Sequence, residues 1–359
     1  MIKPNSFTHD WICKVSNENK ADRILVEKTI RALALLEGLA NTSLPFIFKG
    51  GTALMLMFQK PHRLSIDIDI IVSPRENGID SVLHSICGSN VFTRFECQQR
   101  ASTGDIPAKH YKFYYHSAVE DKEASILLDV LFEENPYNVL LDLPVANAFI
   151  DTETPDVMVK VPDYNNLLAD KMTAFAPRTI GVPYTKGKNS CGMEIIKQLY
   201  DIGRLFDKAD DLLAINSTYR RIAEKELLYH NISCSIDDVL SDTMNNALSI
   251  CFRCSHKGTD YETLLLGIKQ VTNHIFSESF HIEKAILFAA KTYYLAASLM
   301  THSPKIEKYT PSHNAKIAQW TISEYEYTKL NKLKKTNPEA FFYLYEGLQM
   351  SLNKTNNYG

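Results

Sequence analysis

The chain has 359 residues, of which 45% are hydrophobic, an ordinary proportion for a globular protein. This length exceeds that of most single hydrophobic cores, so we expect two domains. The 39 basic and 42 acidic residues give a net charge of −3, which excludes a protein that binds polyanions over its whole surface. Any contact with nucleic acid must come from a local patch.

No stretch reaches the roughly 20 apolar residues that span a bilayer, and the N-terminal residues contain no apolar core of signal-peptide length. We therefore expect a cytoplasmic protein with no membrane partner. The seven cysteines are scattered, which suits reduced thiols. Cys251, Cys254 and His256 look like half of a metal site, but no second pair lies at zinc-site spacing, so a helix carrying two thiols is favoured.

The first half of the chain alternates between helical and strand patterns. Residues 21–40 have helical spacing, and Phe46-Ile47-Phe48 is a short strand that ends at a double glycine. Residues 52–59 then read as helix, and residues 65–72 alternate between acid and isoleucine with the period of a strand. We expect a helix over residues 79–87 and further strands over residues 92–98, 111–115, 126–132 and 156–161.

Beyond Pro162 the pattern is helical. We expect helices over residues 165–175, 194–206, 217–228, 236–252, 261–276, 282–299, 317–333 and 339–352. The most loop-like interior stretch is residues 177–190. The predicted fold class is α+β, with strands and helices in a domain over residues 1–162 and an all-α domain over residues 163–359.

Two aspartates in the acidic strand are the first candidates for a catalytic site. Asp67 and Asp69 are two residues apart, so on a strand both carboxylates lie on one face and the flanking isoleucines on the other. Carboxylates this close repel each other unless a cation lies between them, and hard oxygen ligands favour Mg²⁺. A solvated edge strand is the commoner explanation of a lone Asp-x-Asp, so the pair needs support from its neighbours.

That support comes from Lys49-Gly50-Gly51-Thr52, which lies where a strand passes into a helix. Such a turn offers backbone N–H groups and the positive end of a helix dipole to an anion. Glycine lets a phosphate approach the backbone closely, and Thr52 adds a hydroxyl. Alone, this turn would be a plain helix start. Followed by the acidic strand, it predicts a phosphate site and a metal site at the same end of neighbouring strands.

Together, Phe48 to Leu54 and Arg63 to Asp69 resemble the signature of the AbiEii/AbiGii nucleotidyltransferase toxins. These toxins belong to the DNA-polymerase-β-like superfamily, whose fold is a mixed sheet with helices followed by a helical domain. The resemblance implies Mg²⁺ as the cofactor, as two ions, with Mn²⁺ as the alternative, held by Asp67 and Asp69. It also implies that the nucleotide is bound by the residues Lys49, Gly50, Gly51, Thr52 and Ser65.

A third carboxylate normally completes a two-metal site, and Asp129 is the candidate. It is a single acid inside the apolar run from Ile126 to Phe132, where an unpaired carboxylate is costly. A salt-bridged structural acid is the alternative. Glu133 and Glu134 compete with it, but they fall at the end of the strand, where solvated charges are ordinary.

Two later segments resemble further motifs of the family. Asp170 to Phe175 resembles a helix whose lysine reaches toward the nucleotide, which makes Lys171 a catalytic and nucleotide-binding candidate. Lys197 to Ile202 resembles a motif with two aspartates, but the first of these is Gln198 here, which puts its role in doubt. Asp201 remains as a positioning group or general base. The all-α domain would thus contribute Lys171 and Asp201 to the site.

Basic residues gather in two places. Arg178 and residues 186–188 lie in the interior loop, where a solvated loop explains them equally well. The densest basic and aromatic run contains Lys329, Lys332, Lys334 and Lys335 with Tyr325 and Tyr327, which could bind an RNA backbone or simply form a solvated helix end.

The resemblance implies an enzyme that transfers a nucleoside monophosphate from an NTP to an RNA acceptor, with tRNA favoured, as the toxin of an abortive-infection-type system neutralised by an antitoxin protein. Two alternatives stay open. The acceptor could be a small molecule or a protein side chain, or the chain could be a catalytically decayed nucleotide-binding module.

Overall fold

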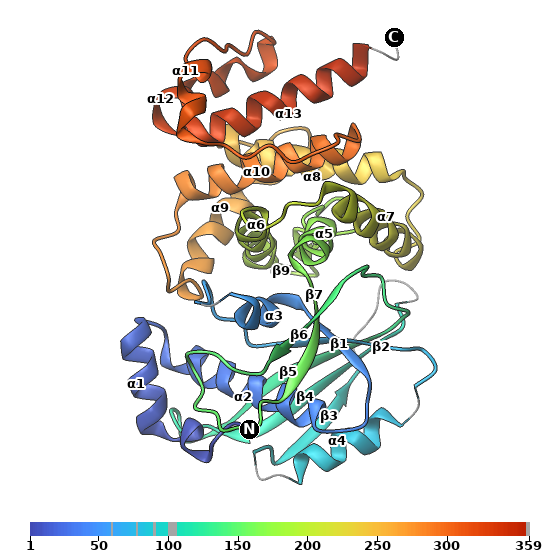
Figure 1. Cartoon of the computed structure of the whole chain (residues 1–359), viewed down its shortest axis with the longest axis vertical. Coiled ribbons are helices and arrows are strands. Elements are labelled where there is room, and N and C mark those ends of the chain that lie inside the picture. The colour runs from blue at the N-terminus through green and yellow to red at the C-terminus, as the bar shows by residue number, and fades with distance from the viewer. Residues whose placement is uncertain (59, 77, 89–90, 100–105, 357–359) are drawn as a thin grey trace. The chain divides into compact units, whose positions relative to one another are not determined.

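The computed structural model of the chain describes residues 1–58, 60–76, 78–88, 91–99 and 106–356. Its contacts divide it into two units, which are Met1–Asp163 with Thr272–Ser279, and Tyr164–Val271 with Phe280–Gly359. The first contains a mixed sheet with helices, and the second is helical (Figure 1). The α+β fold class, with the sheet in the N-terminal part, is confirmed.

The sheet of the first unit has five strands in the order β1-β2-β5-β4-β3. β2 and β5 are parallel, whereas the other neighbours are antiparallel, so the sheet is mixed. β6 and β7 form a separate antiparallel ribbon. The strands are β1 (Phe46–Lys49), β2 (Ile68–Val72), β3 (Arg94–Gln98), β4 (Ala108–His116), β5 (Glu123–Phe132), β6 (Leu140–Pro144) and β7 (Met158–Pro162).

The helices of this unit bury apolar faces against the sheet. α2 contacts β2 and β5, and α4 contacts β3. Asp22 starts α2 as its N-cap, because its carboxylate accepts a hydrogen bond from the Leu25 amide at 2.9 Å. The helices are η1 (Pro4–Phe7, a 3₁₀ turn), α1 (His9–Asn19), α2 (Arg23–Ala40), α3 (Gly50–Met57) and α4 (Ile79–Cys87).

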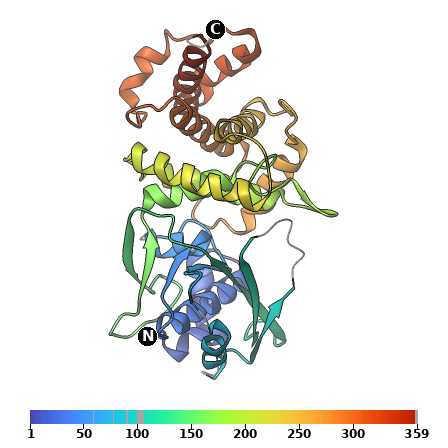
Figure 2. The same ribbon diagram turned by 90° about the vertical axis from the view of Figure 1, so that its right-hand side faces the viewer.

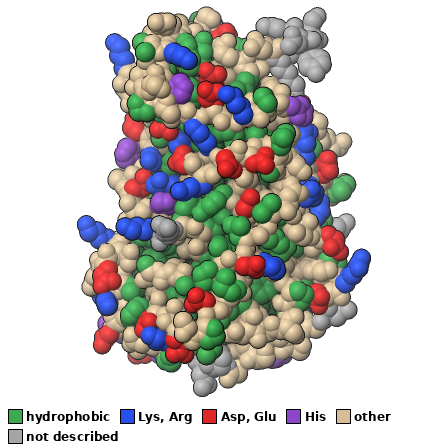
Figure 3. All heavy atoms as spheres, in the orientation of Figure 1, with side chains coloured by type: hydrophobic (Ala, Val, Ile, Leu, Met, Phe, Trp, Pro, Cys, Tyr) green, Lys and Arg blue, Asp and Glu red, His purple; other side chains and the backbone are tan. Residues whose placement is uncertain are grey.

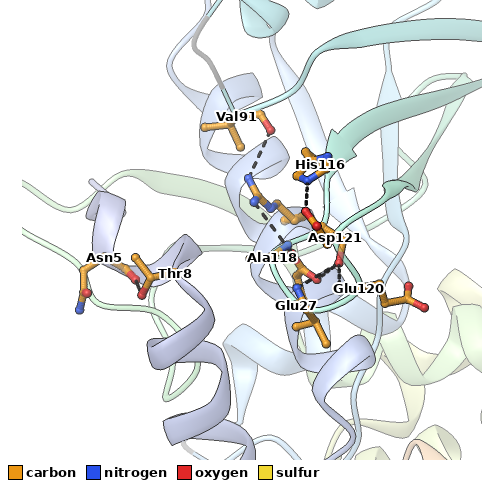
Figure 4. Close-up of polar contacts among 11 residues, drawn as sticks. Asn5, Thr8, Glu27, Val91, His116, Ala118, Glu120 and Asp121 are labelled. Atoms are coloured by element: carbon orange, nitrogen blue, oxygen red, sulfur yellow. Dashed lines mark hydrogen bonds and ion pairs between the residues drawn. The ribbon is translucent and has the colours of Figure 1, made fainter.

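A buried carboxylate ties α2 to the turn between β4 and β5. Glu27 is 1% exposed and accepts hydrogen bonds from the Ser117 hydroxyl at 2.6 Å and the Ala118 amide at 2.7 Å (Figure 4). One helical turn later, Arg31 lies over the rings of Phe7 and Tyr115, 4.8 Å from each centroid. A buried charge is tolerated only with such partners, so this network fixes the end of the β4–β5 hairpin.

The second unit is built around α10, which contacts α6, α8 and α13 (Figures 1 and 2). Its residues from Ala285 to Leu299 are almost all buried, as expected for a helix that is apolar on every side. A short hairpin, β8 (Thr185–Lys186) and β9 (Asn189–Ser190), lies in the predicted loop. The helices are α5 (Tyr164–Ala174), α6 (Gly192–Phe206), α7 (Leu212–Tyr229), α8 (Ile236–Phe252), α9 (Tyr261–Gln270), η2 (Val271–Asn273), α10 (Ile282–Met300), η3 (Pro311–His313), α11 (Asn314–Ile317), η4 (Tyr325–Lys332), α12 (Leu333–Thr336) and α13 (Pro338–Asn356).

Several predicted elements differ in extent from those observed. The helix expected over residues 261–276 ends at Gln270, and the helix expected over residues 217–228 begins at Leu212. The helix expected over residues 317–333 is broken, because the Asn331 side chain bonds to both backbone groups of Ile322 and holds residues 318–324 as a loop. The strand expected over residues 65–72 begins at Ile68, where its pairing with Leu128 on β5 begins. Asp67 therefore precedes the strand. Gln59, the expected end of the helix after the glycine turn, lies outside the described residues.

Candidate functional site

A row of polar residues crosses the sheet of the first unit in register. Asp69 on β2 is the partner of Lys49 on β1 and of Asp129 on β5, and Asp129 is the partner of His110 on β4. Cross-strand partners present their side chains on the same face of a sheet. Asp69 and Asp129 are part-exposed, whereas their neighbours Ile68, Ile70, Leu128 and Val130 are buried. The sheet thus brings the two carboxylates side by side on one face.

Gly50 brings the turn that is predicted to bind phosphate against the Asp69 carboxylate. Its φ is +79°, a left-handed conformation that favours glycine, and a Cβ at this position would lie 1.9 Å from Oδ2 of Asp69. No side chain caps the N-terminus of α3 at Lys49 in the described structure. The dipole end of α3 and the Asp69 carboxylate therefore share one location.

Arg63 and Ser65 converge on the second glycine of the turn. A Cβ on Gly51 would lie 2.4 Å from a terminal nitrogen of Arg63 and 2.8 Å from the Ser65 hydroxyl. Arg63 is only 7% exposed and also donates to the Leu64 carbonyl at 3.1 Å. A guanidinium beside a helix N-terminus favours a phosphate. Sequence reasoning did not select Arg63, although it lies within the recognised signature.

Thr52, which is predicted to bind the nucleotide, also makes a contact within the protein. Its side chain is 0% exposed, and its hydroxyl donates to the backbone carbonyl of Asp67 at 2.6 Å. Thr52 therefore ties the first turn of α3 to the residue that precedes β2. This bond fixes the backbone of Asp67, which the strand itself does not include.

His110 is a second residue that sequence reasoning missed. Its Nδ1 lies 2.7 Å from Oδ1 of Asp129, and the two side chains are 27% and 32% exposed. Such a contact orients a carboxylate. A register between residues 108–116 and 123–132 would have revealed the pairing, but no local pattern shows it. Glu133 is 8% exposed, so the expectation that it is a solvated charge at the strand end is wrong. Its backbone amide donates to the Val72 carbonyl at 3.0 Å.

The helical unit brings together the residues of the two later motifs. Lys171 on α5 lies 3.0 Å from the Asp201 carboxylate on α6, and their side chains are 7% and 1% exposed. The Lys171 ammonium also donates to the Gln198 side-chain oxygen at 3.1 Å. Gln198, which replaces the first aspartate of the motif, thus supplies a neutral acceptor to the same lysine.

The described part of the structure contains no cluster of side chains that could hold a metal ion. No group of three or more His, Cys, Asp and Glu side chains that could hold a metal ion is found among the described residues. Cys251 is buried near the end of α8, while Cys254 is exposed beyond it.

No helix within the described ranges is long and apolar enough to cross a membrane.

The family model of the nucleotidyl transferase AbiEii toxin of type IV toxin–antitoxin systems matches residues 34–257, which is more than half of the chain. Two solved structures from Helicobacter pylori are also similar. JHP933 is 13% identical with a TM-score of 0.43, over 82% of this chain and 96% of its own. A candidate nucleotidyltransferase is 13% identical with a TM-score of 0.42, over 77% and 94%. Similarity at these TM-scores supports no conclusion. No curated protein matches the chain.

Proposed function

We propose that this chain, which belongs to the AbiEii nucleotidyltransferase toxin family, moves a nucleoside monophosphate from an NTP to an RNA end, with tRNA as the favoured acceptor. Membership establishes a nucleotidyltransferase toxin. The acceptor, the metal and the site residues are the proposed part. The observation that carries the proposal is the in-register pair of Asp69 and Asp129, with Gly50 in contact with Asp69.

In the proposed reaction, a hydroxyl oxygen of the acceptor forms a bond to the α-phosphorus of the NTP. The bond from that phosphorus to the oxygen bridging to the β-phosphate breaks, pyrophosphate leaves, and the hydroxyl proton passes to solvent. The turn of Lys49, Gly50 and Gly51 would bind the triphosphate through backbone N–H groups. Arg63 and Ser65, which converge on Gly51, would add a cation and a hydroxyl to the same phosphates.

The donor set fits Mg²⁺, because Asp67, Asp69 and Asp129 supply hard carboxylate oxygens and a triphosphate would supply the rest. When bound, two Mg²⁺ or Mn²⁺ ions would neutralise phosphate charge and activate the attacking hydroxyl. His110 would orient Asp129 for this role.

Lys171 is proposed as the cation that helps to hold the phosphates. Asp201 is 1% exposed and paired with this lysine at 3.0 Å, which favours a positioning role over that of a general base. A base must reach the proton that it removes, whereas a buried ion pair fixes the geometry of its lysine.

The test is to incubate the purified protein with Mg²⁺, cellular RNA and each NTP, labelled at the α- or the γ-phosphate. We expect α-label on RNA with wild type and none with Asp67→Asn or Asp69→Asn, because both remove a proposed metal ligand. The matched control is Asp10→Asn, whose carboxylate is fully exposed on α1. Label on small molecules or protein would move the acceptor to those classes. Transfer of γ-label would replace the proposed reaction with a kinase reaction, and no transfer would favour a decayed module.

The toxin role has its own test. Expression of the chain should arrest growth, and Asp67→Asn or Asp69→Asn should relieve the arrest, whereas Asp10→Asn should not. An antitoxin protein is the expected partner of a toxin of this family. Persistent arrest by both site variants would show that toxicity does not depend on nucleotidyl transfer.

A further inference from the structure

A compact set of exposed cations lies in the helical unit, in the basic and aromatic run near the C-terminus. Acidic and basic side chains are interspersed over the face drawn in Figure 3, so an RNA-binding surface must be local. Residues 311–336 contain five lysines and two glutamates. Lys329, Lys332 and Lys335 are exposed, and none forms an ion pair within the described part of the chain.

The three lysines form a row because of the local helix geometry. They lie three residues apart on η4 and α12. In a 3₁₀ helix, residues three apart eclipse one another with a rise of about 2.0 Å per residue, so successive lysines along η4 are roughly 6 Å apart. The opposite face carries Leu330 and Leu333, which are 1% and 7% exposed. The row therefore faces solvent.

Nearby acids do not neutralise the row. Glu326 precedes Lys329 by three residues, but its carboxylate is 3.3 Å from the Lys257 ammonium and 3.7 Å from Nε2 of His256. Like charges held this close repel one another, so three lysines without acidic partners are better explained by a polyanion that binds them than by stability.

Tyr325 stands beside the lysines with an unusual exposure of 95%. Large aromatic side chains are normally buried at least in part. An exposed ring supplies a platform on which an unpaired base can stack. Three residues before it, Ile322 is held by Asn331, whose side chain accepts from the Ile322 amide at 3.0 Å and donates to the Ile322 carbonyl at 2.9 Å.

We propose that Lys329, Lys332, Lys335 and Tyr325 form an RNA-docking surface, in which the lysines contact phosphates along one strand and the tyrosine stacks on an unpaired base. The identity of this RNA as the acceptor rests on the proposed function. Sequence-independent phosphate contacts bind and orient a nucleic acid, so this surface would lower the concentration of RNA needed for transfer.

The test measures binding of fluorescent tRNA to the full chain by anisotropy over a salt series. We expect Lys329→Gln/Lys332→Gln/Lys335→Gln to weaken binding about 10- to 100-fold near 0.1 M salt and to reduce the slope of log K against log salt by roughly 2–3. The control Lys14→Gln/Lys20→Gln/Lys208→Gln removes the same charge from exposed positions elsewhere. Tyr325→Ala should weaken binding roughly tenfold with an unchanged slope, and Tyr325→Phe should restore it.

The same variants separate this inference from the proposed function. With α-labelled NTP, the lysine variant should raise the KM for RNA and leave kcat at saturating RNA unchanged. If wild type binds RNA but transfers no label, the proposed function fails while the docking surface stands. The docking surface would be overturned if wild type did not bind RNA, or if both triple variants weakened binding equally. It would also be overturned if Lys329→Gln/Lys332→Gln/Lys335→Gln bound RNA as wild type does, even where that variant had lost binding to an antitoxin protein.

Discussion

Gly50 and Asp69 are in such close contact that a Cβ on the glycine would lie 1.9 Å from the carboxylate. Gly50→Ala should therefore abolish nucleotidyl transfer. It should also lower the melting temperature by more than the strain of an alanine at a positive φ would do alone. The control is Gly187→Ala, because Gly187 also has a positive φ (+60°) but has nothing within 4 Å of its Cβ position. That control should cost only about 1–2 kcal/mol. Thermal unfolding measures the loss of stability, and α-label transfer measures the loss of activity. Equal losses in Gly50→Ala and Gly187→Ala would show that the contact with Asp69 does not matter.

His110 should be needed for the rate of transfer because it orients Asp129. His110→Ala is expected to lower kcat about 10- to 100-fold with a smaller change in the KM for NTP. His116 provides a matched control on the same strand, since its Nε2 lies 2.8 Å from the Asp121 carboxylate, but both side chains are well exposed. A fully active His110→Ala, or an equal loss of kcat in His116→Ala, would exclude an orienting role.

Breaking the buried ion pair of Lys171 and Asp201 should lower the free energy of unfolding strongly. Asp201→Ala leaves an ammonium buried with one neutral acceptor, so we expect a loss of about 3–5 kcal/mol. The exposed pair of Lys160 and Asp142 has the same 3.0 Å separation but side chains that are 58% and 61% exposed, and Asp142→Ala should cost about 0–1 kcal/mol.

A volume-conserving double variant separates stability from catalysis. Lys171→Met/Asp201→Leu should recover most of the stability, since apolar residues often replace a buried pair without loss, but it should remain inactive. Urea or thermal unfolding with label transfer tests this, and an active double variant would show that neither charge is needed.

Lys308 should make stability depend on pH. Burial lowers the pKa of its ammonium from 10.5 to about 8, and the group lies 3.8 Å from the centroid of the Phe206 ring. Between pH 8 and 10.5 the unfolded chain binds a proton that the folded chain has released, so this group makes the fold more stable as pH rises through that window.

Lys308→Met should accordingly stabilise the chain more at pH 7 than at pH 9.5, by a difference of roughly 1–3 kcal/mol. Lys305→Met, at a side chain 75% exposed, should show no such difference. A pH-independent effect of Lys308→Met on the melting temperature would mean that the ammonium is well solvated.

Local periodicity predicted the parts of the fold that depend on neighbouring residues. The helix over residues 79–87 has the predicted bounds, and the isoleucines around Asp69 are buried as the strand period requires. The positions of Arg63 and His110 depend on contacts between segments far apart in the chain, which no local pattern contains. The same holds for Asp67, which precedes β2 because the pairing with β5 begins at Ile68.

The segment Thr272–Ser279 belongs to the sheet unit although it follows α9 in the chain. Its His274 carbonyl accepts from the Leu64 amide at 2.8 Å, and the Ser277 hydroxyl donates to the His62 carbonyl at 2.9 Å. Residues 272–279 follow Asp201 in the chain. When the ribosome has made all the predicted site residues, it has therefore not yet made the segment that bonds to the residues beside Arg63. The nascent chain can form these two hydrogen bonds only after Ser277 has emerged, well after the residues of the predicted site have been made.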